Sequence, residues 1–334
     1  MFKYIVKRLL ISIIILLGVS ILIYGLMRMM PMDYVDVKFA AQINTGVITQ
    51  EDVARFKELY GISDNSFRGI MSGYFNWLGN MLKGDLGMSF KYEKPVGEVI
   101  TSNMWISFAI AIVATILQFL IAIPMGITRA THQYSVRDYT VTVFTMIGLS
   151  LPTYFFAAIC IKFFAVDLGI LPTGNLLYAN KSYDLNFIGQ MTKLGDMAVH
   201  LILPILVSVI LSLGGLMRYT RTNTLEVLSA DYIRTARAKG LSEKTVIYKH
   251  AFRNTLIPLA TLLAGILPSL FGGMMITEQV FGIDGIGRLA YQALKDGDIP
   301  FVMGYNMFLA VLTVIGTLFS DIMYSIVDPR VKLG

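Results

Sequence analysis

The segment Ser229-Ala-Asp-Tyr-Ile-Arg-Thr-Ala-Arg-Ala-Lys-Gly-Leu-Ser-Glu-Lys-Thr-Val-Ile-Tyr-Lys-His-Ala-Phe-Arg-Asn254 is polar and rich in Lys and Arg, and it separates two long apolar segments. Short loops on the cytoplasmic side of a membrane carry an excess of Lys and Arg. The segment is therefore predicted to be a cytoplasmic loop that holds a pair of short helices between membrane-spanning helices.

The composition is that of a membrane protein. Hydrophobic residues make up 55% of the 334 residues and charged residues 15%, whereas soluble domains carry about 25% charged residues. Several apolar runs exceed the roughly 20 residues that cross a bilayer. The net charge of +6 lies in short loops, so it indicates membrane topology rather than nucleic-acid binding.

Cysteine and histidine usage indicates neither redox nor metal chemistry. The single cysteine, Cys160, excludes an intrachain disulfide and any cysteine-based metal site. The three histidines, His132, His200 and His250, lie far apart in the sequence and show no ligand spacing. We therefore expect no metal ion and no cofactor on this chain.

Six apolar segments predict an all-α integral membrane protein with six transmembrane helices. They are Leu9–Met29, Ser102–Ile127, Tyr139–Ala165, Ala198–Met217, Leu256–Thr277 and Val302–Ile326. The first is too long for the core of a signal peptide and is predicted to be retained. Basic residues gather at both termini, in residues 128–138 and in the segment quoted above, so both termini are predicted to be cytoplasmic.

Three domains follow from this pattern. Residues 1–30 are predicted to be an N-terminal transmembrane helix, residues 31–101 an extracytoplasmic helical cap, and residues 102–334 a five-helix core that contains the basic loop, 226–255. Helical spacing in the cap begins at Thr49 and again over Ile70–Leu82. The cap is either a platform for a docking receptor or a lid that stabilises the first membrane helix.

The basic loop has its own helix signals. Ser229 is predicted to cap a helix that runs to Ala238, where Gly240 ends it in the left-handed conformation. Ser242 is predicted to cap a second helix that ends near Phe252. An apolar stripe on the first helix comprises Tyr232, Ile233 and Ala236. Periodicity alone is equally typical of an ordinary amphipathic helix at a membrane surface.

The loop also resembles a known family. Asp231-Tyr-Ile-Arg-Thr-Ala-Arg-Ala-Lys-Gly-Leu-Ser-Glu243, followed by His250-Ala-Phe-Arg-Asn-Thr-Leu-Ile-Pro258, is similar to the signature loop of oligopeptide/dipeptide/nickel permeases of binding-protein-dependent ABC importers. The wider superfamily has Glu-Ala-Ala, three residues and Gly; here Arg234-Thr-Ala236 replaces the first three, and Gly240 matches the glycine. Further matches over the whole chain are Gly84-Asp-Leu-Gly-Met-Ser89, Glu278-Gln-Val-Phe-Gly-Ile-Asp-Gly-Ile-Gly287, Asp298-Ile-Pro300 and Asp328-Pro-Arg330.

The resemblance implies a type I ABC importer permease in the bacterial cytoplasmic membrane, as an oligopeptide-type B-like subunit. Its implied partners are a second homologous permease subunit, two cytoplasmic ATPase subunits and an extracytoplasmic solute-binding lipoprotein. The chain lacks the Gly-x-x-x-x-Gly-Lys-Ser/Thr phosphate loop, so it is not expected to be an enzyme. ATP and Mg²⁺ are expected on the ATPase subunits, and peptides, oligopeptides first, are the expected substrates.

The resemblance also implies two groups of site residues. The residues expected to couple the loop to the ATPase are Asp231, Tyr232, Arg234, Ala236, Arg237, Lys239, Gly240 and Leu241. The expected outer-face motif comprises Glu278, Phe281, Gly285 and Gly287. Glu278 is expected to form local hydrogen bonds rather than to contact substrate.

Other functions stay open at this point. An importer of the same family that transports dipeptides or nickel chelates is one alternative to an oligopeptide importer. A secondary transporter or channel that works alone would concentrate ionisable residues in mid-membrane or show repeated halves, and neither is clear here. A membrane scaffold would use the basic loop for docking alone. An intramembrane enzyme is the least favoured, since no nucleophile–base pair stands out.

Overall fold

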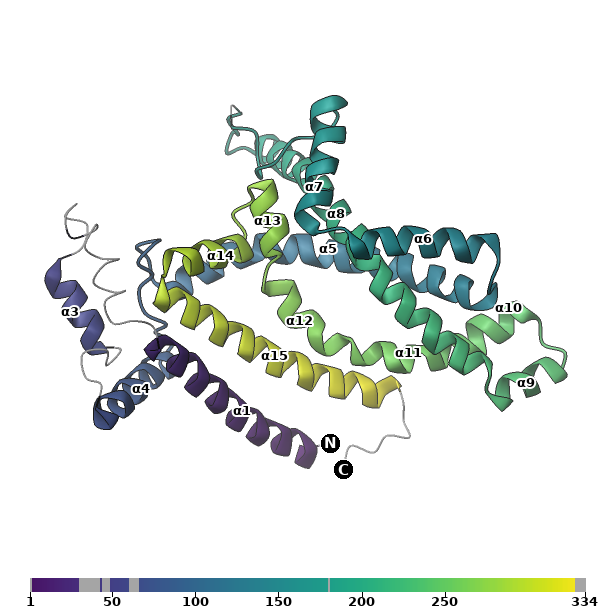
Figure 1. Cartoon of the computed structure of the whole chain (residues 1–334), viewed down its shortest axis with the longest axis horizontal. Helices are drawn as coiled ribbons and strands as arrows, with labels where there is room; N and C mark the ends of the chain where they lie inside the picture. The colour runs from purple at the N-terminus through teal and green to yellow at the C-terminus, as the bar shows by residue number, and fades with distance from the viewer. Residues whose placement is uncertain (1, 30–42, 44–48, 60–65, 180, 328–334) are drawn as a thin grey trace. The chain divides into compact units, whose positions relative to one another are not determined.

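The computed structural model describes residues 2–29, 43, 49–59, 66–179 and 181–327. Its described residues form helices joined by loops (Figure 1). Among the described residues, four helices are long and apolar enough to cross a membrane, and the number rises to six if each of two bent helix pairs is one span. The four are Val6–Arg28, Val96–Thr131, Phe187–Leu228 and Ile299–Ile322.

The chain divides into two compact units. One contains Met1–Asn103 and Leu289–Val314, and the other contains Met104–Arg288 and Ile315–Gly334. The domain boundaries drawn from the sequence stay a prediction. The match Asp328–Arg330 lies outside the described residues.

The first unit packs α1 (Phe2–Arg28), α3 (Gln50–Leu59) and α4 (Phe67–Leu82) with the beginning of α15 (Ile299–Val327). The two helices predicted in the cap are α3 and α4. Their shared core comprises Tyr24, Met27, Val53, Tyr74, Trp77, Ile299, Met303 and Met307. The hydroxyl groups of Ser20 and Tyr74 lie 2.8 Å apart in a buried hydrogen bond. Tyr74 and Trp77 of α4 are therefore buried in one core with Tyr24 and Met27 of α1.

The second unit is built on two long helices, α5 (Val96–Thr131, which begins in the first unit) and α8 (Phe187–Leu228). Between them come α6 (Val136–Ser150), α7 (Thr153–Cys160) and the π-helix η1 (Ile161–Asp167). One of its core clusters joins Ile110, Ala157, Cys160, Leu203, Val207, Phe281 and Ile283.

The predicted span Tyr139–Ala165 is broken in the structure, because the chain bends by 108° between α6 and α7. Leu151 between them is extended, with φ −84° and ψ 130°. A proline disfavours the helical conformation in the residue before it, and Pro152 follows Leu151. The six predicted spans therefore match the structure only when each bent pair counts as one.

The predicted span Leu256–Thr277 is also interrupted. It consists of α11 (Phe252–Thr261), α12 (Leu263–Phe271) and the start of α13 (Met275–Phe281). The chain then turns into α14 (Ile286–Asp296), and the pair Gly265–Phe281 and Ile286–Asp296 is bent by 78°. Gly273, with φ +77°, lies at the break before α13 and has a backbone conformation that other residues adopt at a cost.

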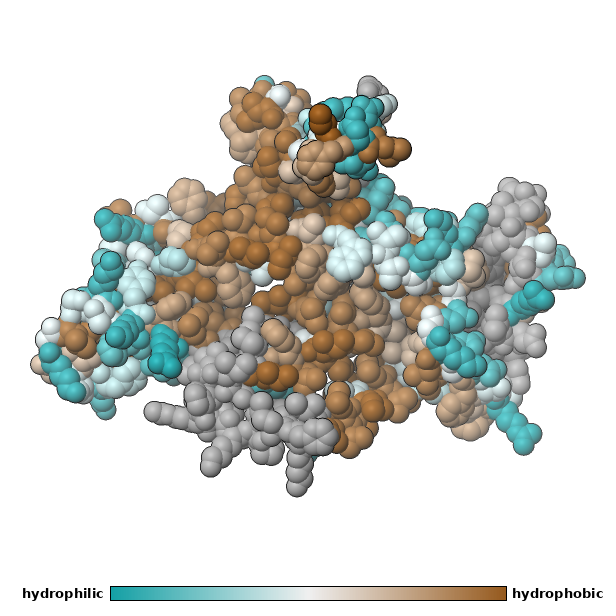
Figure 2. All heavy atoms as spheres, turned by 180° about the vertical axis from the view of Figure 1, so that it is seen from behind, coloured by the Kyte–Doolittle hydropathy of each residue, from teal (hydrophilic) through white to brown (hydrophobic). Residues whose placement is uncertain are grey.

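Large apolar areas cover the outside of the helices. The face shown in Figure 2 carries broad apolar areas in brown, with polar residues in smaller teal groups. On α1, for example, Leu10, Ile14, Leu22 and Leu26 are all more than half exposed. Such surfaces are stable against lipid tails or against partner helices, and this agrees with a membrane-embedded chain.

Candidate functional site

The basic loop begins where α8 ends at Leu228. It forms α9 (Asp231–Ala238), the short α10 (Glu243–Thr245) and the π-helix η2 (Val246–Ala251). Asp231 in the first turn of α9 and Arg237 in the last turn suit the helix dipole. Ile233 and Ala236 are buried with Val246 and Ala251, and Val227 and Leu228 of α8 pack on this cluster. The loop therefore has a small hydrophobic core that includes the end of α8.

Seven of the eight coupling residues predicted in this loop are exposed. They are Asp231, Tyr232, Arg234, Arg237, Lys239, Gly240 and Leu241, whereas Ala236 is buried. Of the predicted apolar stripe, Tyr232 is 44% exposed. Ile233 and Ala236, three positions apart on α9, are the buried residues of the stripe. Partial burial raises the pKa of Tyr232 above its ordinary value, against a smaller opposite effect of its hydrogen bond with Asn254.

The caps of the loop are partly as predicted. Gly240 has φ +76°, which confirms the left-handed end of α9. Ser242 accepts a hydrogen bond from the Thr245 amide and confirms the second cap. Ser229 does not cap α9: it ends α8, where its hydroxyl donates to the Glu226 carbonyl. Ala230 lies at the N-cap of α9 and has no side-chain acceptor.

The second loop helix does not end near Phe252. It passes through η2 directly into α11, which runs to Thr261. A π-helix is wider than an α-helix but keeps its backbone hydrogen-bonded, so the helical backbone continues through η2 without a break. The loop is thus joined by continuous helical backbone to α11.

The charges of the loop are held weakly. Arg237 donates to the Glu243 carboxylate at 2.7 Å, and Arg234 lies 3.5 Å from Asp231, with all four side chains well exposed. Exposed ion pairs contribute about 0–1 kcal/mol. These guanidinium groups can therefore exchange their present partners for acidic groups of another protein at little cost.

The outer-face motif gathers around Glu278, which is fully buried in α13. One carboxylate oxygen accepts hydrogen bonds from the Ser107 hydroxyl at 2.7 Å and the Met274 amide at 2.9 Å. The other accepts from the Arg288 amide at 2.9 Å. Ser107 in turn accepts a hydrogen bond from the Ile286 amide at 2.9 Å. Glu278 thereby ties α5, α13 and α14 together through local hydrogen bonds.

The remaining residues of the predicted outer-face motif also pack here. Phe281 lies in the core cluster of the second unit that contains Ile110 and Leu203. A Cβ atom on Gly285 would lie 2.5 Å from the Glu278 carboxyl carbon, and one on Gly287 would lie 2.8 Å from the Met275 nitrogen. The structure therefore brings all four residues together, with the glycines admitting the carboxylate.

A loop that the sequence did not single out binds to this motif. The Asn175 amide donates to the Phe281 carbonyl at 2.7 Å, and His200 Nδ1 lies 3.0 Å from the Gly174 carbonyl oxygen. Further along the loop, the Lys181 ammonium contacts Asp196 at 2.5 Å. This hydrogen bond raises the pKa of Lys181, against a smaller lowering by desolvation. The sequence signal available was the residue type of Asn175, since Asn tolerates the positive φ of 62° that it adopts here.

Two distant matches in the sequence meet in the first unit. The buried Asp298, before the first turns of α15, accepts hydrogen bonds from the Phe301 amide at 3.2 Å and the Lys91 amide at 3.1 Å. The hydroxyl of Ser89 donates to the same carboxylate at 2.5 Å. Asp298 thus caps α15 and holds the loop that contains Gly84–Ser89, a contact between two motifs that sequence alone could not pair.

Replacing Asp298 with Ala is expected to lower the free energy of unfolding by about 2 kcal/mol, because a helix cap and two buried donors lose their acceptor. The measurement is chemical denaturation of the purified protein in detergent. The matched control is Asp85→Ala, since Asp85 is exposed in the same loop and accepts one bond, from the Gly87 amide. Equal losses in the two variants would contradict the capping role.

Among the described residues, no group of three or more His, Cys, Asp and Glu side chains could hold a metal ion. The contacts above are hydrogen bonds and packing, and they fix the shape of the chain.

Comparison with known sequences decides the family. Residues 122–333 match the family described as the inner membrane component of binding-protein-dependent transport systems. The chain belongs to this family. It is a multi-pass permease component of such a transport system.

Curated relatives match the permease along its whole length. The oligopeptide transport system permease protein AppB of Bacillus subtilis is 39% identical over 99% of this chain and 100% of its own. A putative peptide permease protein of Brucella ovis is 31% identical, with full coverage of both chains. The dipeptide transport system permease protein DppB of Alkalihalophilus pseudofirmus is 31% identical over 99% of this chain and 100% of its own.

One solved structure is also similar to the permease. It is the MetNI methionine ABC transporter in an inward-facing conformation, with 17% identity and a TM-score of 0.49. The match covers 69% of this chain and 96% of that chain.

Proposed function

We propose that this permease is one of two different membrane subunits that enclose the path of an ATP-driven peptide importer, with oligopeptides as the first substrate class. The observation that carries the proposal is the 39% identity, over 99% of the chain, to a relative named as an oligopeptide transport permease. The other relatives described above are named for peptides and dipeptides, which supports the same class of substrate.

The proposed assembly contains a second homologous permease subunit, two cytoplasmic ATPase subunits and an extracytoplasmic solute-binding lipoprotein. ATP and Mg²⁺ bind to the ATPase subunits, and this chain contributes no cofactor and no catalysis. Its basic loop is the ATPase-docking element. The exposed Tyr232 and Leu241 supply apolar contacts, and Arg234, Arg237 and Lys239 meet acidic residues of the ATPase and set the encounter rate.

The proposed topology places both termini and the basic loop in the cytoplasm of a bacterial cell. The support is the excess of Lys and Arg in these segments. Single cysteines at Ala238 and Ser182 on a Cys160→Ala background test it in intact cells. A membrane-impermeant maleimide is expected to label position 182 and to leave position 238 unlabelled. Labelling at 238 alone would reverse the topology.

The first experiment is affinity purification of the tagged permease from its own host, followed by native mass spectrometry and reconstitution into liposomes. A second permease chain and two ATPase chains are expected in the complex. Peptide uptake is expected to require ATP and the binding protein. A chain found alone, in a preparation that preserves control complexes, would overturn the proposed assembly.

Competition in the same liposomes distinguishes oligopeptides from dipeptides, since relatives of both names are similar to this chain. An unlabelled five-residue peptide is expected to block uptake of a labelled five-residue peptide at lower concentration than a dipeptide does. The reverse order would assign the permease to dipeptide transport.

Replacing Gly240 with Val is expected to lower ATP-driven uptake about tenfold or more, because a β-branched residue disfavours left-handed backbone by about 1–2 kcal/mol and alters the docked end of α9. Uptake and ATP hydrolysis are measured in reconstituted complexes of equal subunit content.

The matched control is Gly169→Val. Gly169 has φ +63° and, like Gly240, has no described atom within 4 Å of an added Cβ, but it lies outside the basic loop. Its variant is expected to transport normally. Normal uptake by the Gly240→Val complex would contradict the role of this turn.

A further inference from the structure

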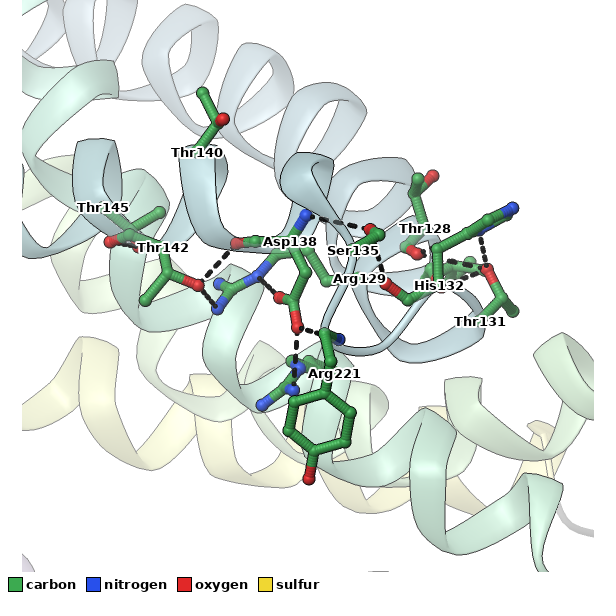
Figure 3. A network of polar contacts seen from close by, with 12 residues as sticks. Thr128, Arg129, Thr131, His132, Ser135, Asp138, Thr140, Thr142, Thr145 and Arg221 are labelled. Atoms are coloured by element: carbon green, nitrogen blue, oxygen red, sulfur yellow. Dashed lines mark hydrogen bonds and ion pairs between the residues drawn. The ribbon is translucent and has the colours of Figure 1, made fainter.

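A buried ionic cluster joins three helices of the second unit (Figure 3). Asp138, at the start of α6, accepts a hydrogen bond from Arg129 Nε of α5 at 3.0 Å and from Arg221 Nη2 of α8 at 3.2 Å. The Arg129 and Asp138 side chains are each 8% exposed, and Arg221 is 29% exposed. One carboxylate therefore holds guanidinium groups from two other helices.

Further hydrogen bonds fix the orientation of the cluster. Arg129 Nη2 donates to the Thr142 hydroxyl at 2.7 Å, and this hydroxyl donates to the Asp138 carbonyl at 2.6 Å. The Tyr134 amide donates to the Asp138 carboxylate at 3.3 Å from the turn between α5 and α6. These hydrogen bonds hold α5 and α6 together as a hairpin, and Arg221 joins this hairpin to α8 by an ion pair.

Close backbone packing accompanies the ionic cluster. A Cβ atom on Gly126 of α5 would lie 2.7 Å from Thr220 Cβ of α8. A Cβ atom on Gly214 of α8 would lie 2.7 Å from Leu149 of α6. Small residues of this kind let helices approach closely but do not by themselves prevent sliding. A bond to a single buried carboxylate fixes the register of α8 against the hairpin.

The same helix leads directly to the basic loop. α8 continues unbroken from Arg221 to Leu228, and Val227 and Leu228 pack on the loop core formed by Ile233, Ala236, Val246 and Ala251. A displacement of α9 therefore passes through the end of α8 to Arg221. The Asp138 cluster is the ionic contact through which that displacement reaches α5 and α6, beside the packing contacts of Gly126 and Gly214.

We propose that Arg129, Asp138 and Arg221 are positioning residues that make α9 and the α5–α6 hairpin move as one body. The inference deepens the proposed function, on which its role in ATP-driven transport rests. Without the Arg221–Asp138 ion pair, α9 would still move with the ATPase, but the α5–α6 hairpin would not follow that movement fully. Hydrolysis would then continue with less transport per ATP.

The central variant is Arg221→Gln, because Arg221 is partly exposed and its replacement leaves the Arg129–Asp138 pair intact. The matched control is Arg218→Gln, one turn earlier on α8, where the side chain is exposed. Arg221→Lys keeps the positive charge, and its label distances and ATP-to-peptide ratio are expected to lie between those of the parent and of Arg221→Gln. The complex is purified with its subunits in a Cys160→Ala background, with nitroxide labels at Ala238→Cys and Tyr139→Cys.

The first readout is the distance distribution between the two labels, with no nucleotide and with a non-hydrolysable ATP analogue. The parent and the Arg218→Gln control are expected to give one narrow distribution that the nucleotide does not change. Arg221→Gln is expected to broaden or shift it. An unchanged narrow distribution in Arg221→Gln would overturn the proposal.

The second readout is the number of ATP molecules hydrolysed per peptide imported, which a purely structural role in a correctly assembled complex would not change. Arg221→Gln is expected to raise this ratio about tenfold, a typical coupling between sites. An unchanged ratio would overturn the role in transport. If the parent complex imports no peptide, the proposed function fails, whereas the label distances still decide whether the helices move together.

Discussion

Replacing Glu278 with Gln is expected to lower the free energy of unfolding by about 3 kcal/mol, because the new amide turns one acceptor into a donor in a buried site. The wild-type carboxylate accepts hydrogen bonds from the Ser107 hydroxyl and from the Met274 and Arg288 amides. Glutamine leaves at least one of these donors facing its NH₂ group. Water cannot replace the lost acceptor, since Glu278 is fully buried.

The measurement is chemical denaturation of the purified permease in detergent, with a change of the same chemistry as control. Asp284→Asn removes a carboxylate of the same turn, but Asp284 is exposed and pairs with Arg288 four residues later. Its loss is expected to cost less than 1 kcal/mol. Comparable destabilisation by both variants would show that the buried hydrogen bonds of Glu278 are not decisive.

Replacing Gly273 with Ala is expected to lower the free energy of unfolding by about 3 kcal/mol, the sum of a left-handed backbone penalty and of overpacking. Gly273 has φ +77°, and a Cβ atom there would overlap the backbone of Gly287, with 2.6 Å to its Cα. The neighbour is main chain, so no rotamer change relieves the clash. The break before α13 would have to open, and the hydrogen bonds of Glu278 would weaken with it.

The same denaturation experiment includes Gly215→Ala as control. Gly215 lies within α8, where an added Cβ meets no described atom within 4 Å. Alanine in a helix interior is favoured over glycine by about 0.5–1 kcal/mol, so this variant is expected to be slightly more stable. If Gly273→Ala unfolds at the same denaturant concentration as the parent, the close approach at the break is not required.

The basic loop shows how far local sequence signals reach. Gly240 and Ser242 act as their local chemistry predicts, because a left-handed turn and a side-chain cap each depend on a few neighbouring residues. The N-cap predicted at Ser229 is wrong because its neighbours on the N-terminal side are already helical. Ser229 follows a helix that extends to Leu228, so it ends α8 instead of beginning α9. Propensity cannot distinguish these roles when one helix follows another almost directly.

The outer-face motif shows the other limit. Its residues were grouped by the resemblance to a known family, but Ser107, which donates a hydrogen bond to Glu278, lies in another helix. The Arg129–Asp138–Arg221 cluster was missed for a similar reason. Its residues are separated in the sequence, and each by itself is an ordinary polar residue beside an apolar segment.

The sequence by itself determined the class of this protein: its apolar runs require a membrane, its basic loops predict an orientation, and its motifs indicate an importer permease. These features depend on composition and short-range order, which one chain displays directly. Tertiary structure alone decided where the predicted spans break and which donors surround Glu278, Asp298 and Asp138. Those outcomes depend on buried polar groups finding partners from distant helices, and burial exists only once the helices have packed.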